Sequence, residues 1–235
     1  MPIDLEKLMN LDLSYPGFSF GYESWALDSY LKVLDDHLAF AQDQYRLRAR
    51  RELESREGDL HPDQYGSELT AIDEAAEIQI PRFFRIGALV PIWGLFESFV
   101  SDIAGWVGRR EGLGLPLRDV RANNFRSQIE KYFEGVLHID LPWTPEERER
   151  LRCLQELRNF IAHRNGRLMD LPPDKEKEIR DLVAKINGVT IECRAVVVSG
   201  AYISEACALV FKLVSSLSKL IAERYDGPTV PRTET

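Results

Sequence analysis

The stretch LRCLQELRNFIAHRNG, residues 151–166, decides how this chain folds. It is the second half of one helix whose start and stop are both visible in the sequence. Thr144 is an N-cap candidate, Pro145 suits the first helical position, and Glu147 completes a capping box with the threonine. Gly166 is the natural stop, because glycine readily adopts the left-handed conformation that ends many helices. The pattern therefore predicts one helix that begins at Pro145 and ends near Gly166.

Apolar residues define the buried face of this predicted helix. They recur at spacings of three and four, as on one side of an α-helix: Leu151, Leu154, Leu157 and Ile161. The opposite side is polar and carries Asn159 and His163. Arg158 lies at the edge of the apolar face, where an unpaired guanidinium is costly. A residue at that place needs a local partner, a facing subunit or an anionic ligand.

The order Arg158-Asn159-x-x-x-His163 resembles the Arg-polar-x-x-x-His signature of HEPN domains. These domains form a superfamily of helical ribonucleases found in toxins, antiviral effectors and some RNA-processing proteins. Their catalytic site is understood to be composite, formed where two copies meet. The resemblance, strongest from about residue 81 to 221, implies a metal-independent endoribonuclease that acts as a homodimer. Its catalytic residues would be Arg158, Asn159 and His163.

The same residues also have an ordinary interpretation. His163 is then a C-terminal helix residue favoured by the helix dipole, Asn159 is a surface polar residue, and Arg158 makes an ion pair at the edge of the core. The arginine-to-histidine spacing also occurs a second time, at Arg56 and His61. A glycine lies between that second pair, and we assign both residues to a polar loop.

Cleavage of RNA without a metal needs a proton acceptor for the 2′-hydroxyl, a proton donor for the leaving 5′-oxygen, and positive charge near the phosphorus. Histidine suits both proton transfers, and arginine binds two phosphate oxygens with its planar fork. One chain offers a single motif histidine, so a second copy would supply the second. Asn159 lies one turn before His163 and is placed to hold either the imidazole or the phosphate.

Three further residues are assigned supporting roles. Glu97, on the most apolar predicted helix, is a candidate partner for Arg158, and its default interpretation is a surface carboxylate. Arg164 and Arg167 follow the motif and are candidates for RNA phosphate contacts, or else cations favoured at a helix C-terminus. The sequence contains no phosphate loop, no zinc-protease motif and no pair of closely spaced cysteines. We therefore predict no metal and no cofactor.

Comparable apolar seams predict three further long helices, and turns and caps indicate the shorter ones. Helices are expected at about residues 4–11, 24–57, 63–80, 90–107, 124–136, 174–187 and 199–225, the last beginning at Ser199 or Ser204, with two strands at 189–193 and 195–198. Pro81 is expected to break or kink the chain, and Pro91 to start or bend the following helix. The fold class is all-α: a HEPN-like helical bundle with a long N-terminal helix and a small β-hairpin near the C-terminus. Residues 1–60 would be an N-terminal extension, residues 61–225 the bundle, and residues 226–235 a mobile tail.

The long N-terminal helix has two parts. Its first part carries one apolar seam, made of Leu27, Leu31, Leu34, Leu38, Ala41 and Tyr45. From Arg46 to Glu57 the chain is rich in arginines with interleaved glutamates. This second part is interpreted as a solvated extension, with a basic RNA-facing arm as the alternative.

Composition and charge limit the kinds of function. The 235-residue chain has a net charge of −8, which argues against general coating by nucleic acid. Residues 144–168 nevertheless hold six arginines against four glutamates, so an RNA contact would be local. Three scattered cysteines are interpreted as core thiols in a reducing cytosol. No signal peptide or membrane span is predicted, which indicates a cytoplasmic protein.

Two classes of function remain open from the sequence. The first is the endoribonuclease, acting on an RNA substrate as a toxin with an antitoxin partner or as an antiviral effector. The second is a catalytically inactive HEPN-like adaptor that binds RNA or a partner protein.

Overall fold

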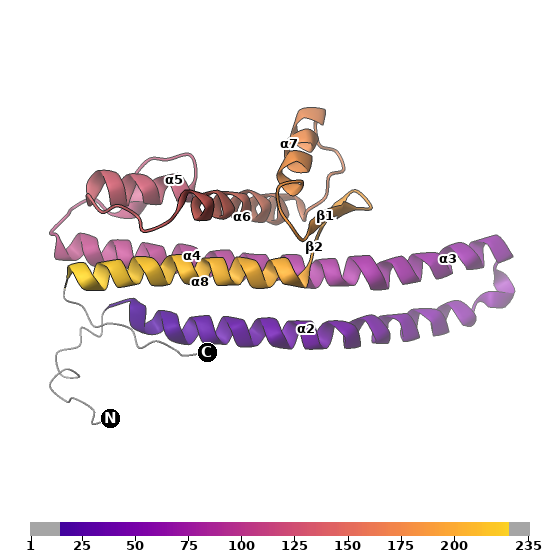
Figure 1. The fold of residues 1–235 in the computed structure, drawn as a ribbon. Coiled ribbons are helices and arrows are strands. Elements are labelled where there is room, and N and C mark those ends of the chain that lie inside the picture. The colour runs from indigo at the N-terminus through magenta and orange to yellow at the C-terminus, as the bar shows by residue number, and fades with distance from the viewer. Residues whose placement is uncertain (1–14, 226–235) are drawn as a thin grey trace, which may run out of the picture. The chain divides into compact units, whose positions relative to one another are not determined.

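The computed structural model describes residues 15–225 and consists of helices with one two-stranded sheet (Figure 1). The helices are α2 (Gly17–Glu54), α3 (Pro62–Glu74), α4 (Ile80–Arg110), α5 (Phe125–Glu130), α6 (Pro145–Arg164), α7 (Pro173–Val183) and α8 (Gly200–Arg224). Strands β1 (Val189–Glu192) and β2 (Ala195–Val198) form an antiparallel hairpin in which Val189 is opposite Val198. The prediction of an all-α fold with a long helix and a small C-terminal hairpin is confirmed.

The chain divides into two compact units, each assembled from separate stretches. The first unit contains residues 15–27, 92–155 and 207–225 of the described chain, and the second contains residues 28–91 and 156–206. Their boundaries fall inside α2, α4, α6 and α8, so each of these helices contributes to both units. The predicted division after residue 60 stays a prediction. The predicted helix at residues 4–11 and the tail at 226–235 lie outside the described residues.

Large aromatic side chains form the core of the first unit. Those that are less than a tenth exposed are Tyr15, Phe20, Trp93, Phe96, Phe99, Trp106, Tyr132, Phe133 and Trp143. The Trp143 ring lies 5.9 Å from the Phe96 ring, and its indole Nε1 donates to the Leu213 carbonyl at 3.0 Å.

The predicted seams of α4 and α8 are also confirmed, because all their members are buried: Leu89, Trp93, Phe96, Val100, Ile103 and Val107, and Ile203, Cys207, Val210, Val214, Leu217 and Ile221.

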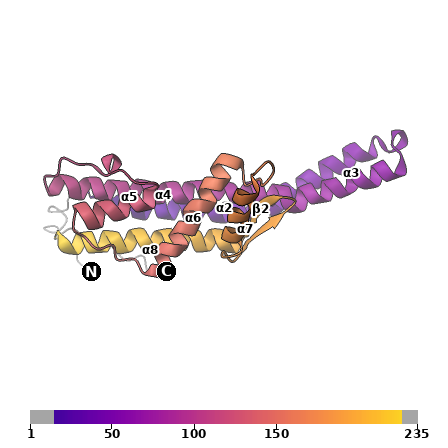
Figure 2. The same ribbon diagram turned by 90° about the horizontal axis from the view of Figure 1, so that it is seen from above.

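In the second unit, α2 and α3 run side by side in opposite directions (Figure 2). Ion pairs join α2 to α3 and to the turn that follows it: Arg46 lies 3.8 Å from Asp73 and 3.0 Å from Glu77, and Arg50 lies 2.8 Å from Asp73. Just past the end of α2, Arg56 lies 3.2 Å from Glu68 of α3. Leu53 is buried between the charged residues. The arginine-rich part of α2 is therefore one half of a helical hairpin. Most of its charged side chains are exposed, as expected of a solvated face, and the alternative RNA-facing arm stays a prediction. His61 caps α3, which confirms that the second arginine–histidine pair belongs to a turn.

Of the two alternatives expected at Pro81, a break is wrong, because the chain stays helical from Pro62 to Arg110, and a kink stays a prediction. A π-helical turn at Ala75–Gln79 precedes the proline, and the Ile80 amide donates to the Ala75 carbonyl five residues back. A proline inside a regular α-helix clashes with the carbonyl four residues before it, and the wider turn relieves this crowding. Pro91 also lies inside α4.

Among the described residues, this helical run, Pro62–Arg110, is by length and composition able to cross a bilayer. Half of its most apolar part is buried inside the protein. The core helix of a bundle has the same length and composition, so this property does not distinguish the two cases.

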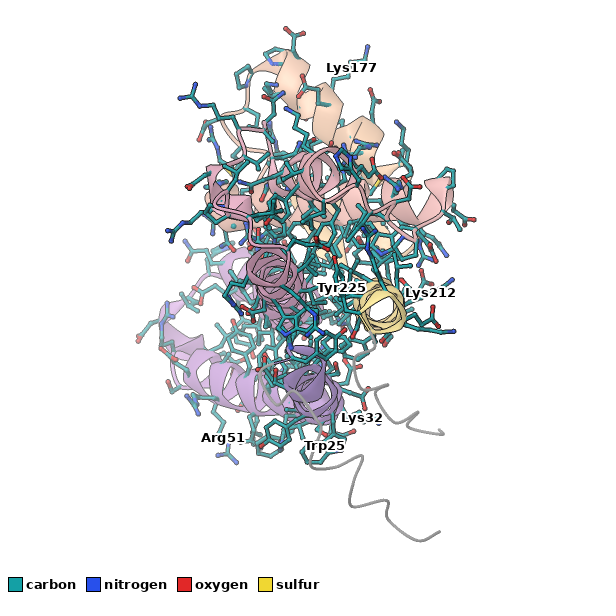
Figure 3. The ribbon with its side chains drawn as sticks, turned by 90° about the vertical axis from the view of Figure 1, so that its left-hand side faces the viewer. Trp25, Lys32, Arg51, Lys177, Lys212 and Tyr225 are labelled. Atoms are coloured by element: carbon teal, nitrogen blue, oxygen red, sulfur yellow. The ribbon has the colours of Figure 1, made fainter. Side chains whose placement is uncertain are left out.

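Helix α2 is apolar on two sides, of which the sequence predicted one. Leu27, Leu34 and Leu38 are buried as expected, whereas Tyr45 is 37% exposed. A second row with seven-residue spacing faces solvent: Val33, Phe40 and Leu47 are 51%, 62% and 47% exposed. Trp25 is 64% exposed and projects from the same helix (Figure 3).

The start of α6 has the capping box that the sequence predicts. The Thr144 amide donates to Glu147 Oε2 at 2.8 Å, and the Glu147 amide donates to Thr144 Oγ1 at 3.2 Å. Lys212, which projects from α8 (Figure 3), lies 2.7 Å from the other Glu147 oxygen. The Lys212 ammonium, and then the Thr144 amide, lower the pKa of the buried Glu147 carboxyl. Three groups thus hold the first turn of α6 within the first unit.

This cap predicts a specific dependence of stability on pH. A lowered pKa in the folded state means that Glu147 stabilises the fold above its ordinary pKa of 4.5 and loses this effect as the pH falls. Replacing Glu147→Gln should lower the free energy of unfolding at pH 7 by about 1 kcal/mol. The difference from the wild type should shrink below about pH 4.5.

Urea unfolding at pH 7 and pH 4 measures both effects. The matched control is Glu146→Gln, since Glu146 is the exposed neighbour in the same turn and its replacement should change little. If Glu147→Gln lowered the free energy of unfolding equally at the two pH values, the role of the Glu147 charge would be contradicted.

Candidate active site

The motif residues lie on the C-terminal half of α6, in the second unit. Their helix buries the predicted apolar face almost completely: Leu151 and Leu157 are 0% exposed, Leu154 is 1% and Ile161 is 5%. On the remaining surface Arg158 and Asn159 are half-buried and His163 is exposed. The imidazole of His163 is therefore accessible to a ligand or to a second copy of the chain.

Arg158 and Asn159 are linked directly to each other. The Arg158 Nη1 donates to Asn159 Oδ1 at 3.0 Å. The amide oxygen thus orients the guanidinium, although the sequence suggested that Asn159 holds the imidazole or the phosphate. Within residues 15–225, the His163 side chain makes no hydrogen bond. The structure therefore gives Asn159 a clear partner in Arg158 and leaves the His163 imidazole open.

The chain leaves α6 through a turn that is anchored to the hairpin. Asn165 and Gly166 both adopt left-handed conformations, with φ of 52° and 65°, which confirms the predicted stop. The Val196 amide then donates to the Gly166 carbonyl at 2.8 Å, and the Leu168 amide donates to the Arg194 carbonyl at 2.9 Å. The segment after α6 thus pairs with β2 and its turn, beside the end of the helix (Figure 1).

Arg82 completes this junction and has no assigned role in the sequence-based prediction. Its side chain is 1% exposed, its Nε donates to the Val196 carbonyl at 3.1 Å, and its Nη2 donates to the Asn165 carbonyl. Burial, and then the nearby Arg167 cation, lower the pKa of the guanidinium. In the sequence, Arg82 stands next to a proline in the mostly apolar run PRFFRIGALVP. Hydrophobic periodicity cannot assign a partner to this arginine.

The two basic residues after the motif, Arg164 and Arg167, are exposed. Their side chains extend from the end of α6 and from the segment that pairs with β2. Their roles, as phosphate contacts or as cations favoured at a helix C-terminus, stay predictions.

The cysteines behave differently from one another. Cys153 and Cys207 are buried as predicted, but Cys193 is exposed, so its assignment to the core is wrong. It occupies the two-residue turn of the hairpin with φ of 48°, and the apolar strand residues around it suggested a continuation of the strand.

Glu97 lies on α4 in the first unit and is half-buried, whereas Arg158 belongs to the second unit. Its role as the partner of Arg158 stays a prediction. Among the described residues, no three histidine, cysteine or acidic side chains come together as they would around a metal ion.

No protein-family model, curated protein sequence or solved structure matches this chain. The likeness to HEPN domains therefore depends on the Arg-Asn-x-x-x-His motif and its helical setting. The function that follows from this likeness is a proposal.

The glycine after α6 provides a test of the junction. Gly166→Ala should lower the free energy of unfolding by about 1–2 kcal/mol, because an L side chain is strained at this positive φ. The added methyl would lie 3.5 Å from Arg82 Nη2, which is an ordinary contact, so backbone strain is the main cost.

Gly87→Ala is the matched control, for which the expected change in the free energy of unfolding has the opposite sign. Gly87 is an exposed residue inside α4 with nothing within 4 Å of an added Cβ, so alanine should stabilise by about 0.5–1 kcal/mol. Chemical denaturation measures both changes. A Gly166→Ala variant as stable as the wild type would contradict the left-handed stop of α6.

Proposed function

We propose that this protein is a metal-independent endoribonuclease of the HEPN type that acts as a homodimer. The observation that supports this most strongly is the pairing of an open imidazole with an oriented guanidinium on one helix. His163 is exposed. Arg158, five residues before it in the sequence, donates from Nη1 to Asn159 Oδ1 at 3.0 Å. The exposed imidazole is accessible to a phosphodiester without a change in the fold of α6, and the half-buried guanidinium is proposed to contact the same phosphate.

The proposed reaction is an internal transfer within the RNA. One imidazole takes the proton of a 2′-hydroxyl, and the resulting oxygen attacks the adjacent phosphorus. The bond from phosphorus to the 5′-oxygen breaks, and a second imidazole, in its protonated form, supplies a proton to that leaving oxygen. The products are a 2′,3′-cyclic phosphate and a 5′-hydroxyl. The Arg158 guanidinium stabilises the extra negative charge on the phosphate oxygens.

The two proton transfers require two imidazoles, and each chain has one in the motif. A two-fold axis beside α6 would bring a second His163 and a second Arg158 to the same phosphodiester. The exposed position of His163 satisfies the main requirement of this arrangement. A histidine buried in its own chain would be unable to share a site.

Local charge supports RNA as the substrate of an acidic protein. Residues 144–168 carry two more arginines than glutamates, whereas the whole chain has a net charge of −8. Exposed Arg164 and Arg167 are proposed to contact phosphates that flank the cleaved bond. The proposed setting is cytoplasmic, without a membrane, as a toxin controlled by an antitoxin or as an antiviral effector.

Cleavage of RNA in excess EDTA tests the proposal. The wild-type protein should cut RNA and leave 2′,3′-cyclic phosphate ends, because no step uses a metal ion. Arg158→Ala and His163→Ala should each lower the rate at least about 100-fold, as expected for loss of charge stabilisation or proton transfer. Matched controls are Arg150→Ala, an exposed arginine of the same helix, and His37→Ala, an exposed histidine of α2. Both should retain full activity.

The alternative adaptor gives a different result in the same experiment. A binding protein would retain RNA on a native gel and leave its length unchanged on a denaturing gel. Cleavage that survives both motif substitutions, or that stops when EDTA is added, would contradict the proposed mechanism.

A further inference from the structure

At Arg82 and Phe83 the charged side chain is buried and the aromatic side chain is exposed, which is the opposite of what their polarity favours. Arg82 is 1% exposed, while the neighbouring Phe83 is 47% exposed. Burying a guanidinium costs free energy unless its donors are well satisfied. A fold that places the charge inside and the aromatic ring outside must gain from the contacts that the arginine makes.

Those contacts are with main-chain carbonyls rather than with a carboxylate. In the described part of the chain, the Arg82 hydrogen bonds go to the carbonyl oxygens of Asn165 and Val196. The guanidinium also lies over the Phe83 ring, 5.0 Å from its centroid. Carbonyls at the end of a helix lack partners within the helix and carry partial negative charge, so a cation there is favourable.

Both acceptors belong to one junction. Asn165 is the first residue after α6, and Val196 is the β2 residue whose amide bonds Gly166. Arg82 therefore joins three elements at one point: α4, the end of α6, and β2. Gly166 lies against this group, since a Cβ on it would be 3.5 Å from Arg82 Nη2 and 3.5 Å from Val196 Cβ.

We propose that Arg82 is a positioning residue for the candidate site. Its planar fork reaches carbonyls on two separate segments, which fixes the last turn of α6 against the hairpin and sets the direction of the His163 and Arg164 side chains. A lysine ammonium lacks the planar fork that joins both segments. This inference depends on the proposed function for its catalytic consequence, but the placement of His163 itself is measurable without RNA.

The first measurement is the NMR spectrum of the histidine side chains. The chain has four histidines, His37, His61, His138 and His163, so three act as internal controls. In Arg82→Met the imidazole resonances of His163 should shift, while those of the other three stay at their wild-type positions. Arg82→Lys should show a smaller shift. Arg85→Met, one turn later on α4, is the matched control and should leave all four unchanged.

The second measurement separates positioning from general stability. At a temperature where the variants are folded by circular dichroism, Arg82→Met should lower kcat about tenfold or more with little change in KM, because substrate binds but is misaligned. Arg82→Lys should fall between the wild type and Arg82→Met, and it remains informative if Arg82→Met fails to fold. Arg85→Met should match the wild type.

The two measurements also distinguish their possible failures. If the His163 resonances of folded Arg82→Met and Arg82→Lys match the wild type, the positioning role is overturned. If those resonances shift but the wild-type protein does not cleave RNA, Arg82 positions His163 and the ribonuclease proposal fails. If the wild type cleaves RNA and the folded Arg82 variants have an unchanged kcat, Arg82 has only a structural role.

Discussion

The placement of the motif depends on the fixing of α6 at both of its ends. In the first unit, Thr144 and Glu147 satisfy each other's amides and Lys212 neutralises the carboxylate. In the second unit, Arg82 and the β2 edge bind the carbonyls that follow the last turn. Each end of α6 is thus fixed within its own unit, and side chains on a fixed element keep a defined geometry.

Local signals in the sequence predicted much of this arrangement. The capping box at Thr144, the glycine at 166 and the apolar seams all depend on residues within a few positions of one another, so one chain is enough to recognise them. The signal that predicted the β1–β2 hairpin was equally local. Exposure of His163 also follows from its position opposite the apolar face.

Most of the features that the sequence could not provide depend on distant partners. Arg82 bonds residues 83 and 114 positions away, and no periodic pattern contains that information. Pro81 was expected to break or kink the chain, but the helix continues after a π-helical turn, and that turn has no simple signature in residue type. The sequence indicated a solvated face for the arginines of α2 but not their acidic partners, which lie on α3 and in the turn after it.

The candidate site lies at the cationic end of one helix, α6, although the protein as a whole is acidic. In the proposed function, such an arrangement would limit RNA contact to the neighbourhood of the motif, where Arg158 is oriented by Asn159 and Arg164 and Arg167 are exposed. On the same proposal a single chain would be an incomplete catalyst, because it has only one motif imidazole for two proton transfers.

A mixing titration tests most directly whether two chains form one site. Wild-type protein is held constant while His163→Ala protein is added, with RNA in excess over total protein and time allowed for subunits to exchange. A composite site predicts that an equal amount of the variant reduces the activity to about half, and an approximately tenfold excess to about one tenth, because wild-type chains are captured in mixed dimers. Activity that stays constant at the largest excess would show that each chain acts alone, and would contradict the composite site.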